Sequence, residues 1–301
     1  MIKQKTYRVF IWGVSAIYNR HLLNLKYRED HGEIEVLGVY DRDICCGSKL
    51  DGYRLVRKEQ IAETPYDFVI VMAKRTEKVI TEEYLELGGK REKILPYRIL
   101  DVPGLTLEQY ETIRNAHFSI ISSDCFGGML SHTLNLPFLS PFVNLWIESG
   151  DYLKIAGDLK HYMSIAPRFV RFQEAMGPFD EKQYPVLKVG DVTLYCNHDR
   201  DPEEAIAKWE RRKQRINYGA LLLTALVNDR DAEKKLKLYK GYTRKMIFTG
   251  YPDPEPDSIY LPSEGRQPLD QLHRSVTEPG SMFDLYSLFF GKVKYRRSME
   301  G

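Results

Sequence analysis

Short apolar runs alternate with polar segments of helical length along the first part of the chain. Four runs have the length and the β-branched or aromatic content of buried strands: Tyr7 to Trp12, Glu33 to Tyr40, Tyr66 to Met72 and Ile94 to Leu100. Between them, helices are predicted at about residues 16–27 and 76–87. Strands that alternate with helices in this way predict right-handed β-α-β units and a parallel sheet.

The alternation resumes after a predicted turn at residues 101–104 and a helix from Thr106 to Arg114. Apolar strands are predicted at Phe118–Ile121, Leu221–Val227 and Lys245–Thr249, and a hairpin is predicted at residues 186–195. Further predictions are helices at residues 129–134, 150–163, 202–216 and 231–239, a surface loop at 252–267 and a docked aromatic tail at 283–290. The predicted fold class is α/β in two domains, residues 1–105 and a larger C-terminal domain, residues 106–301.

Composition places the chain among soluble globular proteins, since 43% of its 301 residues are hydrophobic and 29% are charged. Its 44 Lys and Arg balance 42 Asp and Glu, so a general nucleic-acid binder is not expected. Without an apolar run of roughly 18 residues, no transmembrane segment is predicted. The start has no signal-peptide layout, and we expect a cytoplasmic protein with reduced thiols. Its cysteines lack the spacing of a zinc site: Cys45, Cys46, Cys125 and Cys196.

Polar residues follow the first three predicted strands, at the end where parallel sheets bind ligands. They are Gly13-Val14-Ser15, Asp41-Arg42-Asp43 and Ala73-Lys74-Arg75. Gly13, Ser15 and Asp41 are therefore the candidate cofactor contacts, and Asp41 could accept hydrogen bonds from a ribose. This domain resembles the small Rossmann-like domains that precede sugar-modifying enzymes. Ser15 and Tyr18 stand where the dinucleotide fingerprint has its second and third glycines, so NAD is not favoured. A bound nucleotide or nucleotide-sugar and a purely structural or interaction domain both remain open.

The Phe118 strand runs through a polar, glycine-containing turn into a helix. Unpaired backbone N–H groups and the helix dipole at such a corner can hold a phosphate or a carboxylate. The predicted ligand contacts are Ser122, Ser123, Gly127 and Gly128. A Gly-Gly pair after a strand is also an ordinary way for a chain to turn.

Cys125 and Asp124 are the candidate catalytic groups in this turn. A thiolate is stabilised at a helix N-terminus, so Cys125 could act as a nucleophile, although a small side chain packed under the loop is the commoner role. Asp124 could act as a general base or cap the helix. His132 lies seven residues beyond Cys125, two helical turns away, and need not face it.

A second candidate is the predicted helix that contains Trp209. Lys208, Arg211, Arg212 and Arg215 share one face of it, and arginine forks suit diphosphate oxygens. Such a stripe is usually solvated surface. Asn217 near its end could contact sugar hydroxyls or form the C-cap.

The predicted hairpin ends in Asn197-His198-Asp199. His198 could be an acid–base group, because small shifts move a histidine across neutral pH, and a polar turn explains these residues equally well. Asp199 and Asp201 could recruit Mg²⁺ together with a substrate diphosphate, without a dedicated protein metal site. Residues 228–231, after the Leu221 strand, could likewise be functional or a helix cap.

Several blocks of sequence occur in an order that resembles one bacterial family: SSDCFGG, LPFLSPFVNLWI, DYLKIAGDLKHYM, the stretch Trp209 to Asn217 and KMIFTGYP. Together they cover roughly residues 115–255. Members of that family are labelled exopolysaccharide-biosynthesis proteins. The resemblance implies a pathway, and it brings no reaction and no catalytic residues.

These observations predict a transferase that binds a phosphate-bearing activated sugar or a related donor. The glycine corner and the arginine helix would hold the anion, and Asp124 or His198 would be the general base. A non-catalytic nucleotide-binding sensor or assembly factor, docked on polysaccharide-assembly proteins, is the alternative. A third possibility is a thiol-transfer or redox enzyme that uses Cys125.

Overall fold

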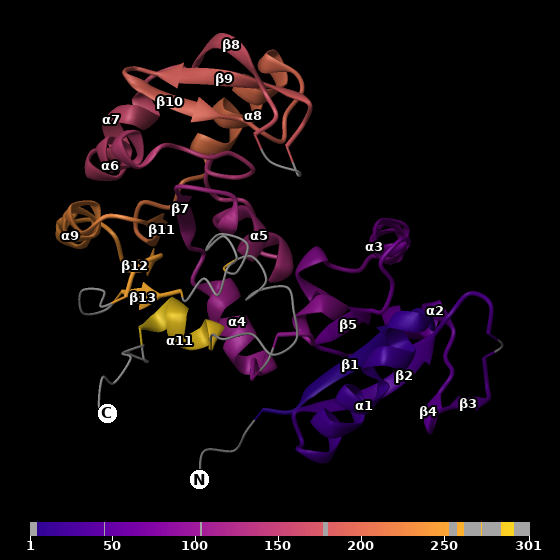
Figure 1. Ribbon diagram of the computed structural model, residues 1–301. Helices are drawn as coiled ribbons and strands as arrows, with labels where there is room; N and C mark the ends of the chain where they lie inside the picture. Colours follow the sequence, from indigo (N-terminus) through magenta and orange to yellow (C-terminus); the bar gives the residue numbers. More distant parts are fainter. Residues whose placement is uncertain are drawn as a thin grey trace, which may run out of the picture. The chain divides into compact units, whose positions relative to one another are not determined.

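The computed structural model describes residues 5–44, 46–102, 104–176, 180–252, 258–261, 272 and 284–291. The chain divides into two compact units, residues 1–111 and 112–301 (Figure 1). Each unit holds a parallel sheet with helices, so the mixed α/β class is confirmed. The sequence placed the division between residues 105 and 106.

The first unit is built on a parallel sheet with the strand order β2-β1-β5-β6. Its strands are β1 (Tyr7–Trp12), β2 (Ile34–Tyr40), β5 (Phe68–Val71) and β6 (Ile94–Pro96), and its helices are α1 (Ala16–Asp30), α2 (Lys58–Glu63) and α3 (Glu77–Glu86). A two-stranded hairpin, β3 (Lys49–Leu50) and β4 (Tyr53–Arg54), was not predicted. The fourth run was predicted as a longer strand, but it turns into a 3₁₀ helix at Tyr97–Ile99 after Pro96.

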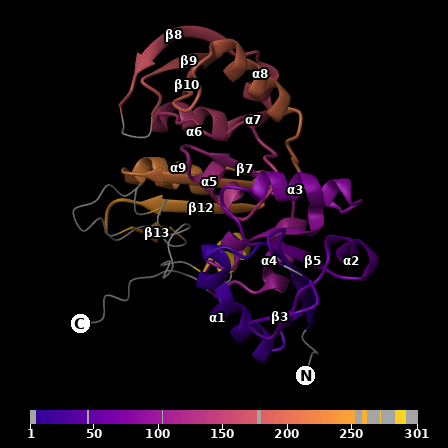
Figure 2. The same ribbon diagram turned by 90° about the vertical axis from the view of Figure 1, so that its right-hand side faces the viewer.

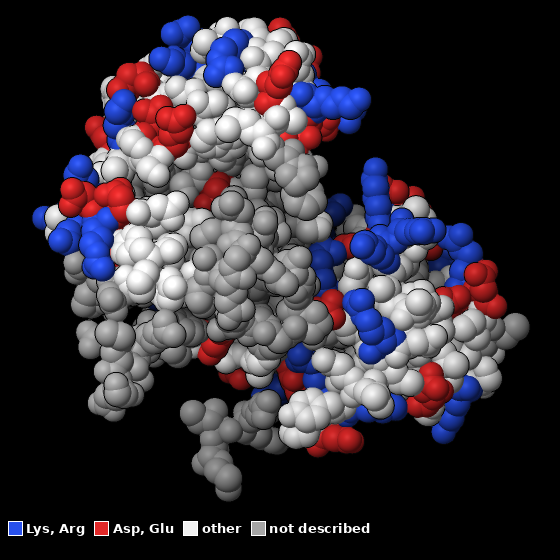
Figure 3. Space-filling view, viewed as in Figure 1, with Lys and Arg blue, Asp and Glu red and all other residues white. Residues whose placement is uncertain are grey.

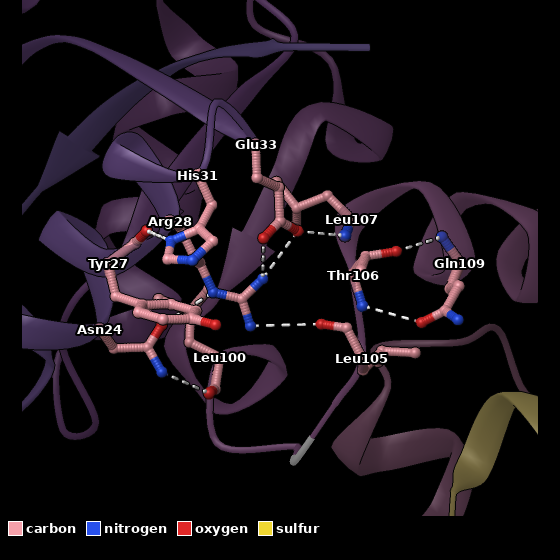
Figure 4. A network of polar contacts seen from close by, with 10 residues as sticks. All are labelled: Asn24, Tyr27, Arg28, His31, Glu33, Leu100, Leu105, Thr106, Leu107 and Gln109. Atoms are coloured by element: carbon pink, nitrogen blue, oxygen red, sulfur yellow. Dashed lines mark hydrogen bonds and ion pairs between the residues drawn. The ribbon is translucent and has the colours of Figure 1, made fainter. Parts of the chain in front are cut away.

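A buried ion pair anchors the end of the first unit (Figure 4). Arg28 Nη1 lies 2.8 and 2.9 Å from the two carboxylate oxygens of Glu33. The Leu107 N–H donates to Glu33 Oε1 at 2.6 Å, and Arg28 Nη2 donates to the Leu105 carbonyl at 3.2 Å. Glu33 thus binds the first turn of helix α4 (Leu107–Asn115). Thr106 and Gln109 also cap the start of this helix, because the backbone N–H of each donates to the side chain of the other.

The second unit contains a parallel sheet in the order β13-β12-β11-β7 and an antiparallel sheet in the order β10-β9-β8. Figures 1 and 2 both show the antiparallel sheet grouped with α6, α7 and α8, while α9 lies beside the parallel sheet. The strands are β7 (Ser119–Ser122), β8 (Arg168–Glu174), β9 (Gln183–Val189), β10 (Val192–Tyr195), β11 (Leu221–Val227), β12 (Arg244–Thr249) and β13 (Ile259–Tyr260). The helices are α5 (Phe126–Thr133), α6 (Ser149–Gly157), α7 (Leu159–Ser164), α8 (Pro202–Lys213), α9 (Arg230–Leu238) and α11 (Leu285–Phe290).

One apolar core joins the two sheets of the second unit. Trp209 of α8 packs edge-on against Phe142, with ring centroids 5.5 Å apart, and both side chains are buried. Tyr152 of α6 is also buried, and its hydroxyl donates to the carbonyls of Ile121 and Thr224 on β7 and β11. Over β8–β10, basic and acidic side chains are interspersed on the face shown in Figure 3.

Several sequence predictions for this unit were wrong in detail. The helix predicted at residues 150–163 is two helices, because Asp158 leaves helical geometry and caps α7. The α5 helix begins at Phe126 rather than at Met129, and α8 ends at Lys213 rather than at Ile216. Strand β8 was missed. The strand β13 falls in the predicted surface loop, most of which lies outside the described residues, as does Phe283 of the predicted tail.

Candidate functional site

The turn between β7 and α5 is capped by its own side chains. Ser122 Oγ accepts from the Gly127 N–H at 3.3 Å, and Asp124 Oδ1 accepts from the Phe126 N–H at 2.8 Å. Ser122 is fully buried. The N–H of Gly127, a predicted ligand contact, and the N–H of Phe126 are therefore paired within the protein, and Asp124 acts as a cap here.

The two glycines of this corner allow close packing. A Cβ atom on Gly127 would lie 2.8 Å from Ser122 Cβ and 2.9 Å from Ile120 Cγ2. A Cβ atom on Gly128 would lie 3.2 Å from both Val143 Cγ1 and Asn144 Oδ1. Both glycines are buried, and they let α5 pack on β7 and on the segment that follows α5. Their predicted role as ligand contacts stays a prediction.

Cys125, at the same corner, lies next to His198. The Cys125 Sγ is 3.3 Å from His198 Nε2 and 3.9 Å from the Leu145 carbonyl oxygen. Both side chains are partly accessible. His198 follows β10, whereas Cys125 follows β7, so the fold unites residues that are distant in sequence. The histidine that meets Cys125 is His198, not His132.

Backbone hydrogen bonds hold the segments around this pair side by side. The Ile147 N–H donates to the Ser123 carbonyl at 2.9 Å. Trp146 and Tyr195 exchange two backbone hydrogen bonds of 3.0 Å, and their rings stack with centroids 3.8 Å apart. The residues on either side of Trp146 therefore bring the Cys125 corner against the end of β10, where His198 begins the next turn.

Burial and nearby carboxylates control the Cys125 thiol. Burial raises the pKa of Cys125 to about 12, with a further rise from the Asp124 charge and a smaller one from Asp180, while a hydrogen bond from the Asn197 side chain lowers it. The resting thiol is therefore protonated at neutral pH. Any nucleophilic role needs a base that removes the proton as the reaction proceeds, and His198 Nε2 is placed to do so.

The arginine helix approaches the corner through an intervening segment. Arg212 Nη1 donates to the Val143 carbonyl at 3.4 Å, and Val143 also packs on Gly128. Burial lowers the pKa of Arg212, and the Asp199 charge opposes that effect. Arg211 and Arg215 are exposed. Arg212 therefore contacts the segment that packs on Gly128, and it does not face the capped corner directly.

Comparison with known proteins places most of this chain in one family. Residues 100–272 match the model of the domain of unknown function DUF1919, which is more than half of the sequence. The chain belongs to the DUF1919 family. Residues 5–95 match a family described as C2185-like, N-terminal. The chain is also 31% identical over 150 residues to an uncharacterised protein of Haemophilus influenzae, a match that covers 49% of this chain and 69% of that relative.

Asn217 of the DUF1919 domain lies away from the Cys125–His198 pair, and its predicted contact with sugar hydroxyls stays a prediction. Its backbone N–H donates to Ser119 Oγ at 2.8 Å, and its Nδ2 donates to the His117 carbonyl at 3.2 Å. It therefore lies at the amino end of β7, while Cys125 follows the carboxyl end. It is not the C-cap of α8 either, because that position is Gln214.

The acids considered for Mg²⁺ have other partners in the DUF1919 domain. Asp199 Oδ1 lies 2.6 Å from Lys208 Nζ, and Asp201 Oδ1 accepts from the Glu204 N–H to cap α8. Asp229 caps α9 in the same way. Among the described residues no group of three or more His, Cys, Asp or Glu side chains is arranged to hold a metal ion.

The predicted cofactor residues of the first unit meet at the end of β1. Gly13 adopts φ 102°, a conformation that favours glycine. Asp41 Oδ2 accepts from the Val14 N–H at 2.6 Å, and its Oδ1 accepts from the Asp43 N–H. Ser15 caps α1 and donates to the Met72 carbonyl at 2.7 Å. Both Asp41 oxygens thus order this loop.

Two residues of the DUF1919 site were missed as functional candidates. Asn197 was noted only as part of a turn, yet it is buried directly before His198. Asp180 precedes β9 and accepts from Asn197 Nδ2 at 2.8 Å. No spacing in the sequence connects residues 125, 180 and 197. The pairing of β9 with β10 brings Asp180 to Asn197, and the backbone hydrogen bonds of Trp146 and Ile147 bring the Cys125 corner to the end of β10.

Proposed function

We propose that the DUF1919 unit is a transferase of surface-polysaccharide biosynthesis that acts on a phosphate-bearing activated sugar or a related donor. Its reactive centre is the Cys125–His198 pair. The observation that carries this proposal is the 3.3 Å separation of Sγ and Nε2 at the carboxyl edge of a parallel sheet, where ligands bind. The pathway rests on the family resemblance of the sequence blocks.

Cys125 differs from an ordinary core cysteine of the same unit. Cys196 is 4% exposed, and no hydrogen bond to its thiol is present among the described residues. The Cys125 thiol is partly accessible, has an imidazole nitrogen within hydrogen-bonding distance and stands at a helix start. A nucleophile beside a base is the arrangement that covalent catalysis requires.

The reaction then follows in two balanced halves. In the first, Sγ bonds to the donor carbon as the thiol proton moves to His198 Nε2. The bond from that carbon to the phosphate-bearing leaving group breaks, and the leaving group takes the proton from Nε2. In the second, an acceptor hydroxyl attacks the carbon and gives its proton to Nε2. The carbon–sulfur bond breaks, and that proton returns to Sγ.

The cationic end of α8 supports a phosphate-bearing donor. Arg211 and Arg215 are exposed, and both lie close enough to Arg212 to lower its pKa. Guanidinium groups bind phosphate oxygens in pairs of hydrogen bonds. In this proposal Arg211 and Arg215 hold the phosphate groups, whereas Arg212 positions the segment that covers Gly128.

The first unit is proposed to be a Rossmann-like domain that binds a nucleotide or nucleotide-sugar. In its strand order, β2 lies on one side of β1 and β5 on the other, so the chain reverses direction across the sheet between β1 and β5. Such points bind ligands in parallel α/β sheets, and Gly13 and Ser15 follow β1 there. A nucleotide-sugar donor would place the protein in the cytoplasm, in keeping with free thiols.

Isothermal titration of the full chain with a panel of nucleotide-sugars, with and without Mg²⁺, tests the donor class. Heat is expected for at least one donor. An Arg211→Ala/Arg215→Ala double variant should bind it about tenfold or more weakly, because charge-assisted hydrogen bonds are lost. A Lys234→Ala/Lys235→Ala variant on α9 is the matched control for lost positive charge. Absence of heat with every donor would contradict the proposal.

A non-catalytic sensor or assembly factor is the second candidate. The capped corner and the protonated Cys125 thiol favour it. Cys125→Ala separates the two functions. If the protein is an enzyme, the variant loses polymer synthesis but still binds its partner proteins. If it is an assembly factor, polymer synthesis is lost only when partner binding is lost as well. Polymer yield and co-purification of partners are the two measurements.

A further inference from the structure

A stacked aromatic pair lies at the β10 edge of the antiparallel sheet. Trp146 and Tyr195 form a β-bridge, and their rings lie parallel to within 4°, with centroids 3.8 Å apart. Both side chains are partly exposed. The other tryptophans of the chain, Trp12 and Trp209, are each 3% exposed. Trp146 is therefore the tryptophan whose ring a ligand can reach.

An arginine lies on the same face of the sheet as this pair. Tyr195 of β10 is opposite Val186 of β9, and Val186 is opposite Arg171 of β8. Residues directly opposite each other on neighbouring strands point to the same face. Because neighbouring strands lie about 4.8 Å apart, the row from Trp146 to Arg171 spans about 14 Å. The guanidinium group and the two rings thus belong to one surface.

Two further cations lie in the next row of this face. Lys188 of β9 is opposite Arg168 of β8, and Lys188 stands two residues from the middle of the first row. The extra residue Val170 forms a bulge, which keeps Arg168 and Arg171 on one face although they are three residues apart. We call this surface the aromatic–cationic face; it consists of Trp146, Arg168, Arg171, Lys188 and Tyr195.

The opposite face of the sheet packs into the core. Leu187 of β9 and Leu194 of β10 are opposite each other and fully buried, in the same apolar core as Trp209 of α8. Phe169 and Phe172 point to that side, where their rings are in contact with centroids 5.1 Å apart. The aromatic–cationic face is therefore the side of the sheet that points away from this core.

The cations of the aromatic–cationic face are not neutralised by nearby acids. Its two arginines are exposed and Lys188 is partly exposed, and none of the three has a carboxylate partner in the part of the chain that the structure describes. The acids at the β10 edge have partners, since Asp151 and Asp191 share Lys154, at 3.1 and 2.9 Å. Free positive charge beside an aromatic surface suits a ligand that combines rings with anionic groups.

We propose that the aromatic–cationic face binds an acidic glycan, a chain of sugar rings that carry carboxylate groups. One sugar ring lies against the Trp146–Tyr195 pair, because its C–H groups meet the negative face of an aromatic ring. Carboxylates of the neighbouring rings bind Arg168, Arg171 and Lys188, and the arginines bind them through paired hydrogen bonds.

The face is connected to the reactive pair by short stretches of chain. Tyr195 stands three residues before His198. Leu145, the neighbour of Trp146, has its carbonyl oxygen 3.9 Å from Cys125 Sγ. We assign the acidic glycan as the acceptor of the transferred sugar, and this assignment rests on the proposed function, whereas binding of the glycan does not.

Glu148 makes a nucleic acid a poor fit to the same face. Its Oε1 accepts from the Tyr195 hydroxyl at 3.1 Å, so a carboxylate stands at the aromatic end. It would repel the phosphates that accompany every base of a nucleic acid. Sugar hydroxyls, in contrast, can donate hydrogen bonds to a carboxylate. The charges of this face thus favour a glycan, with hydroxyls at the aromatic end and carboxylates at the cationic end.

Protection of tryptophan fluorescence from acrylamide quenching tests the proposal on the full chain. Because Trp12 and Trp209 are buried, acrylamide reaches mainly Trp146. Hexagalacturonate and a hyaluronan hexasaccharide are the acidic probes, and maltohexaose is the neutral probe. At least one acidic probe is expected to protect Trp146, and maltohexaose should need an at least tenfold higher concentration for the same protection, because it cannot pair with the cations.

Two exposed arginines and a matched pair of control residues locate the site. Arg168→Ala/Arg171→Ala should raise the concentration of acidic probe for half protection about tenfold or more. Lys49→Ala/Arg54→Ala is the control, because these exposed cations also lie opposite each other on two paired strands, β3 and β4, and should change nothing. Trp146→Leu, followed by isothermal titration, should bind the acidic probe about threefold to tenfold more weakly.

Several results would overturn the proposal. They are the absence of protection by both acidic probes, equal protection by maltohexaose, and an arginine double variant that behaves like the control. A single-stranded oligonucleotide is included as a different polyanion. If it protects Trp146 as well as the acidic glycans do and depends equally on the two arginines, the face is a nucleic-acid site and the proposal is wrong.

This test is separable from that of the proposed function, because it needs no donor and no turnover. If no donor binds but an acidic probe protects Trp146 through the two arginines, the glycan site stands and the donor class is wrong. If a donor is turned over and neither acidic probe binds, the glycan site alone is overturned.

Discussion

At the residue scale, the environment of a polar side chain decides its role more than its identity does. Ser122 and Asp124 pair with N–H groups of α5, and for Asp124 this is the capping role that the sequence left open beside that of a general base. Cys125 and His198 meet at hydrogen-bonding distance because the end of β10 lies against the β7 corner. The sequence identifies the residue types, but the partner of each one depends on packing between distant segments.

The Arg28–Glu33 pair yields a prediction for the stability of the first unit. Glu33→Gln leaves the buried Arg28 without its counter-charge and should lower the free energy of unfolding by about 2–4 kcal/mol. Glu35→Gln is the matched control, because Glu35 pairs with Arg8 on the surface at 3.5 Å and should change stability by less than about 1 kcal/mol. Urea unfolding measures both, and equal losses would contradict the account.

Buried thiols should make stability fall in alkaline solution. Burial raises the pKa of Cys196 from 9.0 to about 12. The raised pKa stabilises the folded chain fully below the pKa of the Cys196 thiol in the unfolded chain. This stabilisation is lost as pH rises toward the pKa of the folded thiol, because only the unfolded thiol ionises in this window. Cys196→Val should therefore lose less stability than wild type between about pH 9 and pH 12. Urea unfolding under reducing conditions at each pH measures this, and an equal loss of stability with pH in Cys196→Val and wild type would refute it.

At the element scale, strands and helices with strong apolar patterns were predictable, and exposed or broken ones were not. The buried strands β1, β7 and β11 and the β9–β10 hairpin follow from apolar runs and turn residues. Strand β8 was missed, because its hydrophobic side chains Phe169, Val170 and Phe172 are exposed, and Phe169 and Val170 are adjacent, so strict alternation is absent. Asp158 splits one predicted helix into two through a single non-helical residue.

The corner formed by β7 and α5 provides a prediction at this scale. Gly127→Ala places a Cβ atom within 3 Å of Ser122 and Ile120, so it should lower the free energy of unfolding by about 1–3 kcal/mol. Gly150→Ala, in the first turn of α6 where no atom lies within 4 Å of the added methyl group, should stabilise the protein by up to about 1 kcal/mol. Unfolding curves in which both changes have the same sign would contradict the packing role.

At the scale of the whole molecule, the two units define what a stable fragment must contain. The first unit extends to Glu111, beyond its last strand, because Leu105 and Leu107 bind Arg28 and Glu33 (Figure 4). The predicted boundary at residue 105 left out the contact between Leu107 and Glu33. The sequence before β2 does not indicate which residue pairs with the buried carboxylate of Glu33. In the part of the chain that the structure describes, no helix is long and apolar enough to span a bilayer.

Fragments of the first unit test this boundary. Residues 1–115 should fold with cooperative unfolding, whereas residues 1–102 leave Arg28 and Glu33 without their backbone partners and should be less stable by about 2–4 kcal/mol. Circular dichroism during urea titration provides the comparison. Equal stabilities would show that the α4 start contributes little to this unit.

The central claim is that Cys125 and His198 form one reactive pair, and intact-mass analysis with active donors tests it most directly. The full chain is incubated with each nucleotide-sugar of the panel, quenched in acid and weighed, beside Cys125→Ala, His198→Ala and the control Cys196→Ala. The account predicts a mass gain on wild type and Cys196→Ala, a loss of that gain in Cys125→Ala and a strong reduction in His198→Ala. Transfer of sugar to an acceptor at the wild-type rate by Cys125→Ala would contradict it.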